Sequence, residues 1–273
     1  MTPPLVVLTD FFDVSNHALS YAAGLAVPLD AHLVLLHVRH DALLAPETCD
    51  SQHPARSERQ TAQALLQQLA ADQPVPTEVD ISEEFLPGAV TEAVRQHHPL
   101  LLVLGRPGSA TAPAEIVSST VQALLRYAPC PLLVVPTVGW KSLPPKRLLL
   151  AVDGQPFRIG AHQDVLRQLL LATQSTLDVV HVSGQQPQPS RAALLDTVRA
   201  NNLVDHVADS CLHEVVQATA MGGVLQEAAR QQADLLVIVA RHHSLLGSLF
   251  HRSVTAQLIQ ESLIPVLVLP AED

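Results

Sequence analysis

The 273-residue chain is 48% hydrophobic and 15% charged, which gives enough length and apolar content for two domains with buried cores. Its formal net charge of -10 argues against a nucleic-acid partner, because phosphate backbones bind to basic surfaces. No apolar run approaches the roughly 20 residues of a membrane span, and three scattered cysteines without CxxC spacing exclude a disulfide framework. Because its first residues show no signal-peptide pattern, the chain is expected to be cytoplasmic.

Short apolar runs alternate with helical patterns along the first half. Leu5 to Thr9 is predicted to be a buried strand, and Ser15 to be the N-cap of a helix with Ala18, Ala22 and Leu25 on one face. Further strands are predicted over 32–38, 76–82, 100–104 and 131–135, and further helices around Leu65–Leu69, around Ala89–Val94 and over 119–127. Five continuously apolar strands that alternate with four helices predict a parallel, doubly wound α/β sheet covered on both faces.

The second half repeats the first at a nearly constant spacing. Gly88 in LPGAVTEAV corresponds to Gly223 in MGGVLQEAA, and PLLVVP at 131–136 corresponds to PVLVLP at 265–270. A match of separate segments at such constant spacing indicates a duplicated domain.

The boundary between the copies is predicted at TVGWKSLPPK, residues 137–146, where glycine and proline interrupt regular structure. The chain is thus expected to form two tandem five-stranded domains, residues 1–139 and residues 146–273. In the second domain, the segment from Arg147 to Leu269 repeats the same order of strands and helices.

One edge of the first predicted sheet carries residues that suit a phosphate. In doubly wound sheets, ligands bind beyond the carboxyl ends of the strands, and Asp10 and Gly105 end the first and fourth strands. Gly105 and Gly108 let backbone approach a ligand closely, and the hydroxyl triplet at 118–120 is expected to begin a helix whose free N–H groups attract anions. Glycine turns and serine caps explain the same residues without any ligand, and the loop is not a Walker loop.

These patterns resemble those of tandem universal stress proteins over nearly all of both halves. ATP-binding members of that family carry Gly-x2-Gly-x9-Gly-(Ser/Thr) after the fourth strand and an Asp at the end of the first. Here Gly105-Arg106-Pro107-Gly108 matches the first two glycines, Ser109 to Val117 follow, and Ser118 stands in place of the third glycine. YAPCPLLVVP resembles the C-terminal signature of the family, whose final strand commonly pairs across domains or subunits.

The resemblance implies a Rossmann-like fold of the adenine nucleotide alpha hydrolase type, arranged as an intramolecular pseudo-dimer. It also implies that the first domain binds ATP or a related adenine nucleotide, with Asp10 able to share Mg²⁺ with the phosphates. The residues that it assigns to the nucleotide are Thr9, Asp10, Val38, Leu104, Gly105, Gly108, Ser118, Ser119 and Thr120. Two departures weaken the match, since Pro107 lacks an N–H and Ser118 adds a side chain; Arg106 either offsets phosphate charge or is a solvated surface residue.

The second domain departs further from the family pattern. Ala240 replaces the first glycine and His243 the second, and the bulk of His243 and Arg252 is expected to intrude where a triphosphate would lie. This half is therefore expected to bind no ATP and to supply packing or bind something else. Its loop histidines lack the spacing of a metal site, and no metal is predicted there.

Three functions remain open on the sequence alone. The first is a stress-response switch that binds an adenine nucleotide in its first domain and recruits a protein partner. The second is a scaffold of the same fold that acts only through protein contacts. The third and least favoured is a slow ATP hydrolase, because no nucleophile–base pair with a sequence signature is present. The sequence also leaves open whether the chain forms a homodimer.

Overall fold

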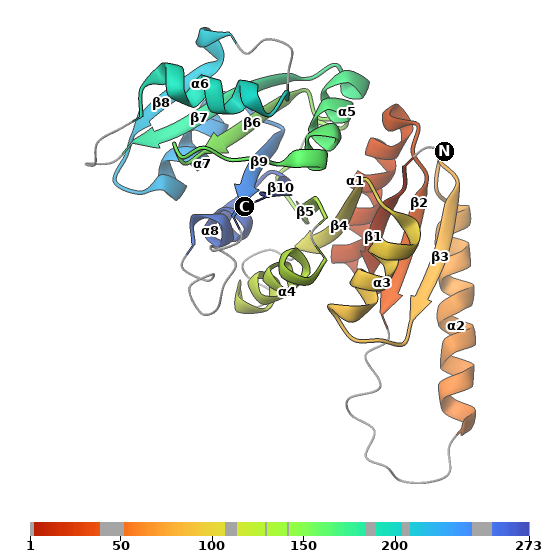
Figure 1. Cartoon of the computed structure of the whole chain (residues 1–273). Coiled ribbons are helices and arrows are strands. Elements are labelled where there is room, and N and C mark those ends of the chain that lie inside the picture. Colours follow the sequence, from red (N-terminus) through yellow and green to blue (C-terminus); the bar gives the residue numbers. More distant parts are fainter. Residues whose placement is uncertain are drawn as a thin grey trace.

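The computed structural model describes residues 3–38, 52–106, 114–128, 130–140, 142–183, 189–203, 208–241 and 253–272, with backbone alone for 52–59 and 114–119. All ten strands join one sheet in the order β3-β2-β1-β4-β5-β10-β9-β6-β7-β8 (Figure 1). Each half supplies five strands in the doubly wound order, so the predicted fold class is confirmed. Within the described ranges, no helix combines the length and the apolar character that crossing a membrane requires.

The elements alternate in both halves. The first half contains β1 (Leu5–Thr9), α1 (Asp13–Leu29), β2 (Leu33–Val38), α2 (Gln52–Ala71), β3 (Thr77–Ser82), α3 (Gly88–His97), β4 (Leu101–Arg106), α4 (Ala114–Tyr127) and β5 (Leu132–Pro136). The second half contains β6 (Arg147–Val152), α5 (Gln163–Thr173), β7 (Thr176–Ser183), α6 (Arg191–Ala200), β8 (Leu212–Val216), α7 (Ala220–Arg230), β9 (Leu235–Ala240), α8 (Val254–Glu261) and β10 (Val266–Pro270). Short 3₁₀ turns precede α5, at Gly160–His162, and β8, at Asp209–Cys211.

Two apolar layers cover the sheet, one on each face. Successive side chains of β1 point to opposite faces, so Leu5 and Val7 pack in one layer and Val6 and Leu8 pack in the other. Helices α1, α2, α5 and α6 supply the first layer, and α3, α4, α7 and α8 supply the second. Full burial of such side chains stabilises the fold by about 1.5–3 kcal/mol each, which explains why the strands are continuously apolar.

The two halves meet through an antiparallel pairing of β5 with β10, the only described neighbours in the sheet that do not run parallel. Val134 lies opposite Val266, and Leu132 opposite Val268. Helix α1 packs on α5 and α4 packs on α8 across the same junction. The final strands therefore pair across the halves, as the family resemblance implied.

Two predicted helix starts are wrong. Helix α1 begins at Asp13 with Phe12 as its N-cap, and Ser15 lies inside the first turn, where its hydroxyl donates to the Phe12 carbonyl at 2.9 Å. Helix α4 begins at Ala114, so the hydroxyl triplet at 118–120 lies beyond its first turn. The sequence offers a stronger start signal there, because Pro113 suits the beginning of a helix and Glu115 suits its positive end.

Candidate functional site

The carboxyl ends of β2, β1 and β4 form one edge of the first-half sheet, and five of the predicted nucleotide residues lie there. The pairing of Thr9 with His37 places Val38 next to the end of β1, and the pairing of Val7 with Val103 carries Thr9 alongside Gly105. Of these residues, Thr9 is buried, Val38, Leu104 and Gly105 are half-buried, and Asp10 is exposed. We call this edge the first-half crevice.

Asp10 is open to solvent in this crevice. One carboxylate oxygen, Oδ1, accepts a hydrogen bond from the Phe12 N–H at 3.1 Å, and the Asp10 N–H donates to Ser15 Oγ at 3.4 Å. Among the described residues no cation lies within 4 Å of the carboxylate. Asp10 therefore keeps acceptor capacity for hydroxyl donors or for a cation.

An aromatic pair lies beside Asp10. Phe11 adopts a left-handed backbone with φ of 67°, which is uncommon for a bulky residue, and its ring centroid lies 4.7 Å from that of His37. His37 Nδ1 lies 2.9 Å from the Thr9 carbonyl oxygen, so this ring nitrogen carries the proton and donates. The contact fixes the imidazole at the end of β2, on the edge that holds Val38.

Gly105 is required by packing within the protein. A Cβ at this position would collide with the backbone carbonyl of Val14 in the first turn of α1. The close approach permitted by the missing side chain is thus that of helix α1 to strand β4, rather than that of a ligand.

Arg106 lies at the junction of the two halves, so its interpretation as a solvated surface residue is wrong, and its interpretation as an offset for phosphate charge stays a prediction. Only 7% of the residue is exposed, and its guanidinium donates to the carbonyl oxygens of Gln260 at 2.7 Å and Ser262 at 2.5 Å. Desolvation lowers the pKa of Arg106, and the nearby Glu261 partly opposes this effect. The accepting carbonyls belong to the carboxyl-terminal end of α8, where the helix dipole favours a cation.

The remaining predicted phosphate residues are only partly placed. Gly108 lies outside the described residues, and Ser118 and Ser119 lie in the part of α4 where only backbone is described. Thr120 is half-buried within the helix. Because α4 begins at Ala114, its free N–H groups belong to the first turn rather than to the predicted triplet.

A second crevice of about 320 Å³ lies at the equivalent edge of the second half. Arg241 lines it, and its guanidinium forms a two-point ion pair with Asp153, with Nε–Oδ2 and Nη2–Oδ1 distances of 2.9 Å each. The same guanidinium donates to the carbonyls of Gln155 and Pro156. The described lining also includes Ser253, whose Oγ accepts from the Ala256 N–H at 3.1 Å and caps α8.

The Asp153–Arg241 pair escaped sequence reasoning, although the repeat held a signal for it. The spacing that aligns the two halves places Asp153 on Asp10 and Arg241 on Arg106. The same two residue types therefore have different partners in each half. His243 and Arg252, which were expected to obstruct this half, lie outside the described residues.

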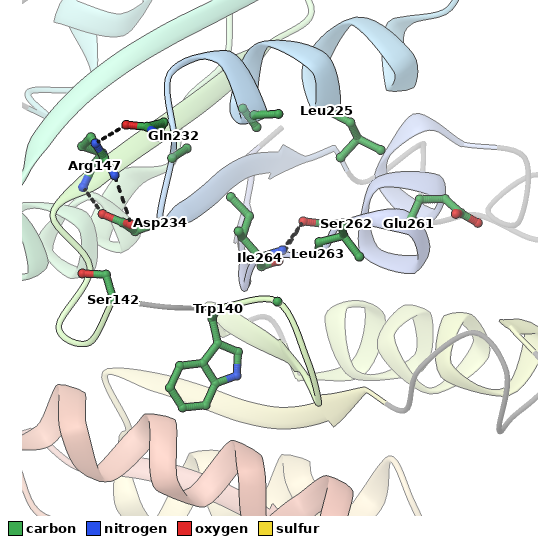
Figure 2. A pocket seen from close by; sticks show the side chains of 14 residues that line it. Trp140, Ser142, Arg147, Leu225, Gln232, Asp234, Glu261, Ser262, Leu263 and Ile264 are labelled. Carbon is green, nitrogen blue, oxygen red and sulfur yellow. Dashed lines mark hydrogen bonds and ion pairs between the residues drawn. The ribbon is translucent and has the colours of Figure 1, made fainter.

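A larger cavity, of about 570 Å³, lies beside the segment that joins the halves (Figure 2). We call it the linker cavity. Its walls come from the linker, the end of α7, the turn before β9 and the turn before β10. They include Gly139, Trp140, Ser142, Arg147, Leu225, Ala228, Ala229, Gln232, Ala233, Asp234, Glu261, Ser262, Leu263 and Ile264. Sequence reasoning missed this cavity, because residues from distant segments build it.

Other reactive side chains carry no site in the described structure. Burial raises the pKa of the Cys130 thiol to about 12, so Cys130 is an inert packed residue. Across the described ranges, no group of three or more histidine, cysteine or carboxylate side chains is arranged to hold a metal ion. The histidines at 242, 243 and 251 lie outside these ranges.

The fold and these edges define a class of protein: a tandem, doubly wound α/β chain with a strand-order switch at the carboxyl-end edge of the sheet in each half. The family model described as the universal stress protein family matches residues 1–136 and again 145–270. The chain therefore belongs to the universal stress protein family.

Solved structures agree with this fold over the whole chain. A universal stress protein from Archaeoglobus fulgidus DSM 4304 superposes with a TM-score of 0.68 at 17% identity, covering 100% of this chain and 98% of that one. A functionally unknown protein from Pseudomonas aeruginosa PAO1 superposes with a TM-score of 0.57 at 18% identity, covering 99% and 93%. No curated protein sequence matches the chain.

Proposed function

We propose that this universal stress protein binds ATP or a related adenine nucleotide in its first-half crevice and acts as a cytoplasmic stress-response switch. One contrast carries the proposal: the Asp10 carboxylate is exposed and lacks a described cation partner, whereas Asp153 is held by Arg241 on two oxygens. An open carboxylate at the strand-order switch is suited to accept ribose hydroxyls or to share a cation with phosphates.

The described residues suggest a role for each part of the crevice. The backbone at Val38 flanks the base, Thr9 and Asp10 flank the ribose, and the chain that leaves β4 at Gly105 leads toward the phosphates. Because α4 begins at Ala114, we assign the phosphate-facing N–H groups to its first turn rather than to the hydroxyl triplet.

Arg106 provides the route by which occupancy would reach the second half. It follows Gly105 directly, and its guanidinium holds the end of α8. Ligand contacts that reposition the segment after Gly105 would shift Arg106, and with it the packing of α8. A contact between the halves that ligand occupancy can shift is what a binding switch needs.

Calorimetric titration with ATP and Mg²⁺ tests the proposal. We expect saturable binding by the unmodified chain, at least tenfold weaker binding by Asp10→Ala, and unchanged binding by the matched control Asp153→Ala. Absence of both heat and thermal stabilisation up to millimolar ATP would reject nucleotide binding. An equal loss in both variants would remove the first-half crevice as the specific site.

A nucleotide-free scaffold is the competing function, and the packing role of Gly105 favours it, because Val14 explains this glycine without a ligand. The scaffold predicts the negative titration described above. Slow hydrolysis is distinguished by release of labelled ADP over several turnovers, which a pure binding switch would not show.

A further inference from the structure

We propose that the outer edge of strand β3 is a docking site for an extended basic peptide segment of a partner protein, which adds to the sheet as one more strand. Strand β3 ends the ten-stranded order, and Figure 1 shows it at the border of the first half with α2 beside it. A groove of about 740 Å³ lies between β3 and α2. We call it the β3 groove, and its described lining comprises Gln63, Gln67, Ala70, Ala71, Thr77, Glu78, Val79 and Ile81. This proposal does not depend on nucleotide binding.

The backbone along the outer edge of β3 is available for pairing. The Pro76 carbonyl accepts from the Leu33 N–H of β2 at 2.9 Å, so the backbone groups at position 76 face β2. Backbone groups alternate in direction along an extended strand, so those of Thr77, Val79 and Ile81 face away from β2. Within the described residues, these outward N–H and C=O groups have no hydrogen-bond partner. Such a row of unpaired groups is a template for another strand.

The opposite end of the sheet shows how this fold covers an edge. Strand β8 ends the order there, and the Gln217 N–H donates to the Ser183 carbonyl of β7, so the backbone of Leu212 faces outward. The Arg191 guanidinium of α6 donates to this Leu212 carbonyl at 2.7 Å and pairs with Glu214 at 2.9 Å. The described α2 wall of the β3 groove offers no such cover, because it carries only glutamine and alanine. The edge of β3 is therefore the more accessible of the two.

The walls of the β3 groove suit small apolar side chains on an added strand. The α2 wall consists of two glutamines and two alanines, which the helical repeat brings onto one face. On the β3 side, Val79 and Ile81 pack against the first apolar layer but remain half-exposed. An added strand would place every second side chain beside these two residues, where small apolar groups gain by burial.

The charges along this edge favour a basic partner. Glu78 is exposed and lines the groove, Glu84 is exposed just beyond β3, and neither pairs with a cation among the described residues. Asp80, between them, pairs with His97 at 3.1 Å. A second copy of β3 would bring its own carboxylates against these, and like charges on adjoining strands are destabilising. Lysine side chains on a peptide strand would face carboxylates instead, so the charge pattern favours a basic segment over self-association.

Peptide probes test the proposal on the unmodified chain, followed by ¹H–¹⁵N NMR at low salt. The basic probe alternates lysine and valine over six residues, the length of β3, with blocked ends, and its acidic counterpart alternates glutamate and valine. We expect saturable binding of the basic peptide with a Kd of about one millimolar or tighter, and binding at least tenfold weaker for the acidic one. Amide exchange at Val79 and Ile81 should slow at least tenfold at saturation, because new hydrogen bonds would hold these N–H groups.

Two modified peptides separate backbone pairing from attraction between charges. Both have the basic sequence, and one carries N-methyl groups on every valine, the other on every lysine. Only one N–H edge of a peptide strand faces β3, so one of the two should bind at least tenfold more weakly than the parent peptide. Equal binding by the parent and both methylated peptides would reject strand addition.

Two pairs of variants locate the site. Val79→Pro removes an outward N–H and none of the bonds to β2, a position where edge strands accept proline, and Val216→Pro is the matched control at the exposed end of β8. Glu78→Lys is matched with Asp164→Lys, an equal change of charge in the first turn of α5. The basic peptide should bind at least tenfold more weakly to Val79→Pro and Glu78→Lys, and with unchanged affinity to both controls.

Three results would overturn the proposal: no saturable binding of the basic peptide, equal binding of the acidic peptide, or unchanged binding by Val79→Pro. A dimer in analytical ultracentrifugation that Val79→Pro abolishes would assign the edge to a second copy of the chain and would also reject a basic peptide as its occupant. The peptide comparisons require no variant, so misfolding of a variant would not leave the proposal untested.

Discussion

Gly105 and its counterpart Ala240 differ by one methyl group. Whether a half has room for this methyl group depends on where the helix after its first strand begins. In the first half, α1 begins at Asp13, directly after the turn that contains Asp10, and the Val14 carbonyl lies against Gly105. In the second half, α5 begins only at Gln163, after a longer turn, and the buried Ala240 side chain is accommodated. A family motif position thus carries a steric demand that depends on where the first helix starts.

Gly105→Ala is expected to lower the free energy of unfolding by about 1–3 kcal/mol, because the added methyl group displaces the first turn of α1. Urea unfolding followed by circular dichroism measures the loss. Gly88→Ala is the matched control, since its Cβ would meet only the carboxylate end of the exposed Glu84 side chain. Unchanged stability of Gly105→Ala together with loss of ATP binding would assign this glycine to the ligand instead.

At the scale of the elements, most of the fold could be predicted because burial on both faces makes every core strand continuously apolar. Leu101 to Val103 and Leu235 to Val237 show this plainly, and the strand that contains Leu101 lies within two residues of the predicted bounds, 100–104. The start of α4 could not be predicted from its hydroxyls, because Ser, Thr and Pro signals compete over a few residues. Local patterns decide strands more firmly than they decide helix ends.

The candidate site was predictable only where strand ends define it. Asp10 and Gly105 follow from the alternation of elements and Thr9 and Val38 from the family resemblance. The partners of Arg106 and Arg241, by contrast, depend on contacts between distant segments. Two arginines at equivalent repeat positions have different partners: Arg106 donates to carbonyls of the other half, and Arg241 pairs with Asp153 of its own half. The hydrophobic periodicity of the sequence does not indicate which partner each arginine binds.

Arg106 links two elements of different halves, and its removal should weaken the junction. Arg106→Met keeps the aliphatic length but leaves the carbonyls of Gln260 and Ser262 without their donor, so we expect a loss of about 1–3 kcal/mol in urea unfolding. Arg95→Met is the control, because Arg95 forms only an exposed pair with Glu92 and should change stability by less than about 0.5 kcal/mol. Equal stability of Arg106→Met and Arg95→Met would show that the junction does not depend on this guanidinium.

At the scale of the whole molecule, the two halves form one continuous sheet, whereas two merely linked domains would each have a sheet of their own. The pairing of β5 with β10 makes one sheet, and the α1–α5 and α4–α8 contacts cover this junction on both faces. In addition, the Trp140 indole donates to the Pro136 carbonyl at the end of β5, and Arg106 donates to the Gln260 carbonyl of α8. Each half alone would expose a fully apolar edge strand, β5 or β10, which is a hazard for aggregation. The pseudo-dimer is therefore expected to be the unit that folds.

We accordingly expect a single unfolding transition in urea, with Trp140 fluorescence at the junction and far-UV circular dichroism of both halves superimposable. The physical reason is that separating β5 from β10 exposes Leu133, Val134 and Leu267, all buried, and removes hydrogen bonds from both halves at once. Independent halves would instead give a fluorescence change that precedes part of the loss of secondary structure. Arg106→Met provides a further test, because it weakens the junction. If each half is stable by itself, the fluorescence and circular dichroism transitions should separate in this variant. If the shared sheet makes both halves stable, the two transitions should move together to lower urea concentration.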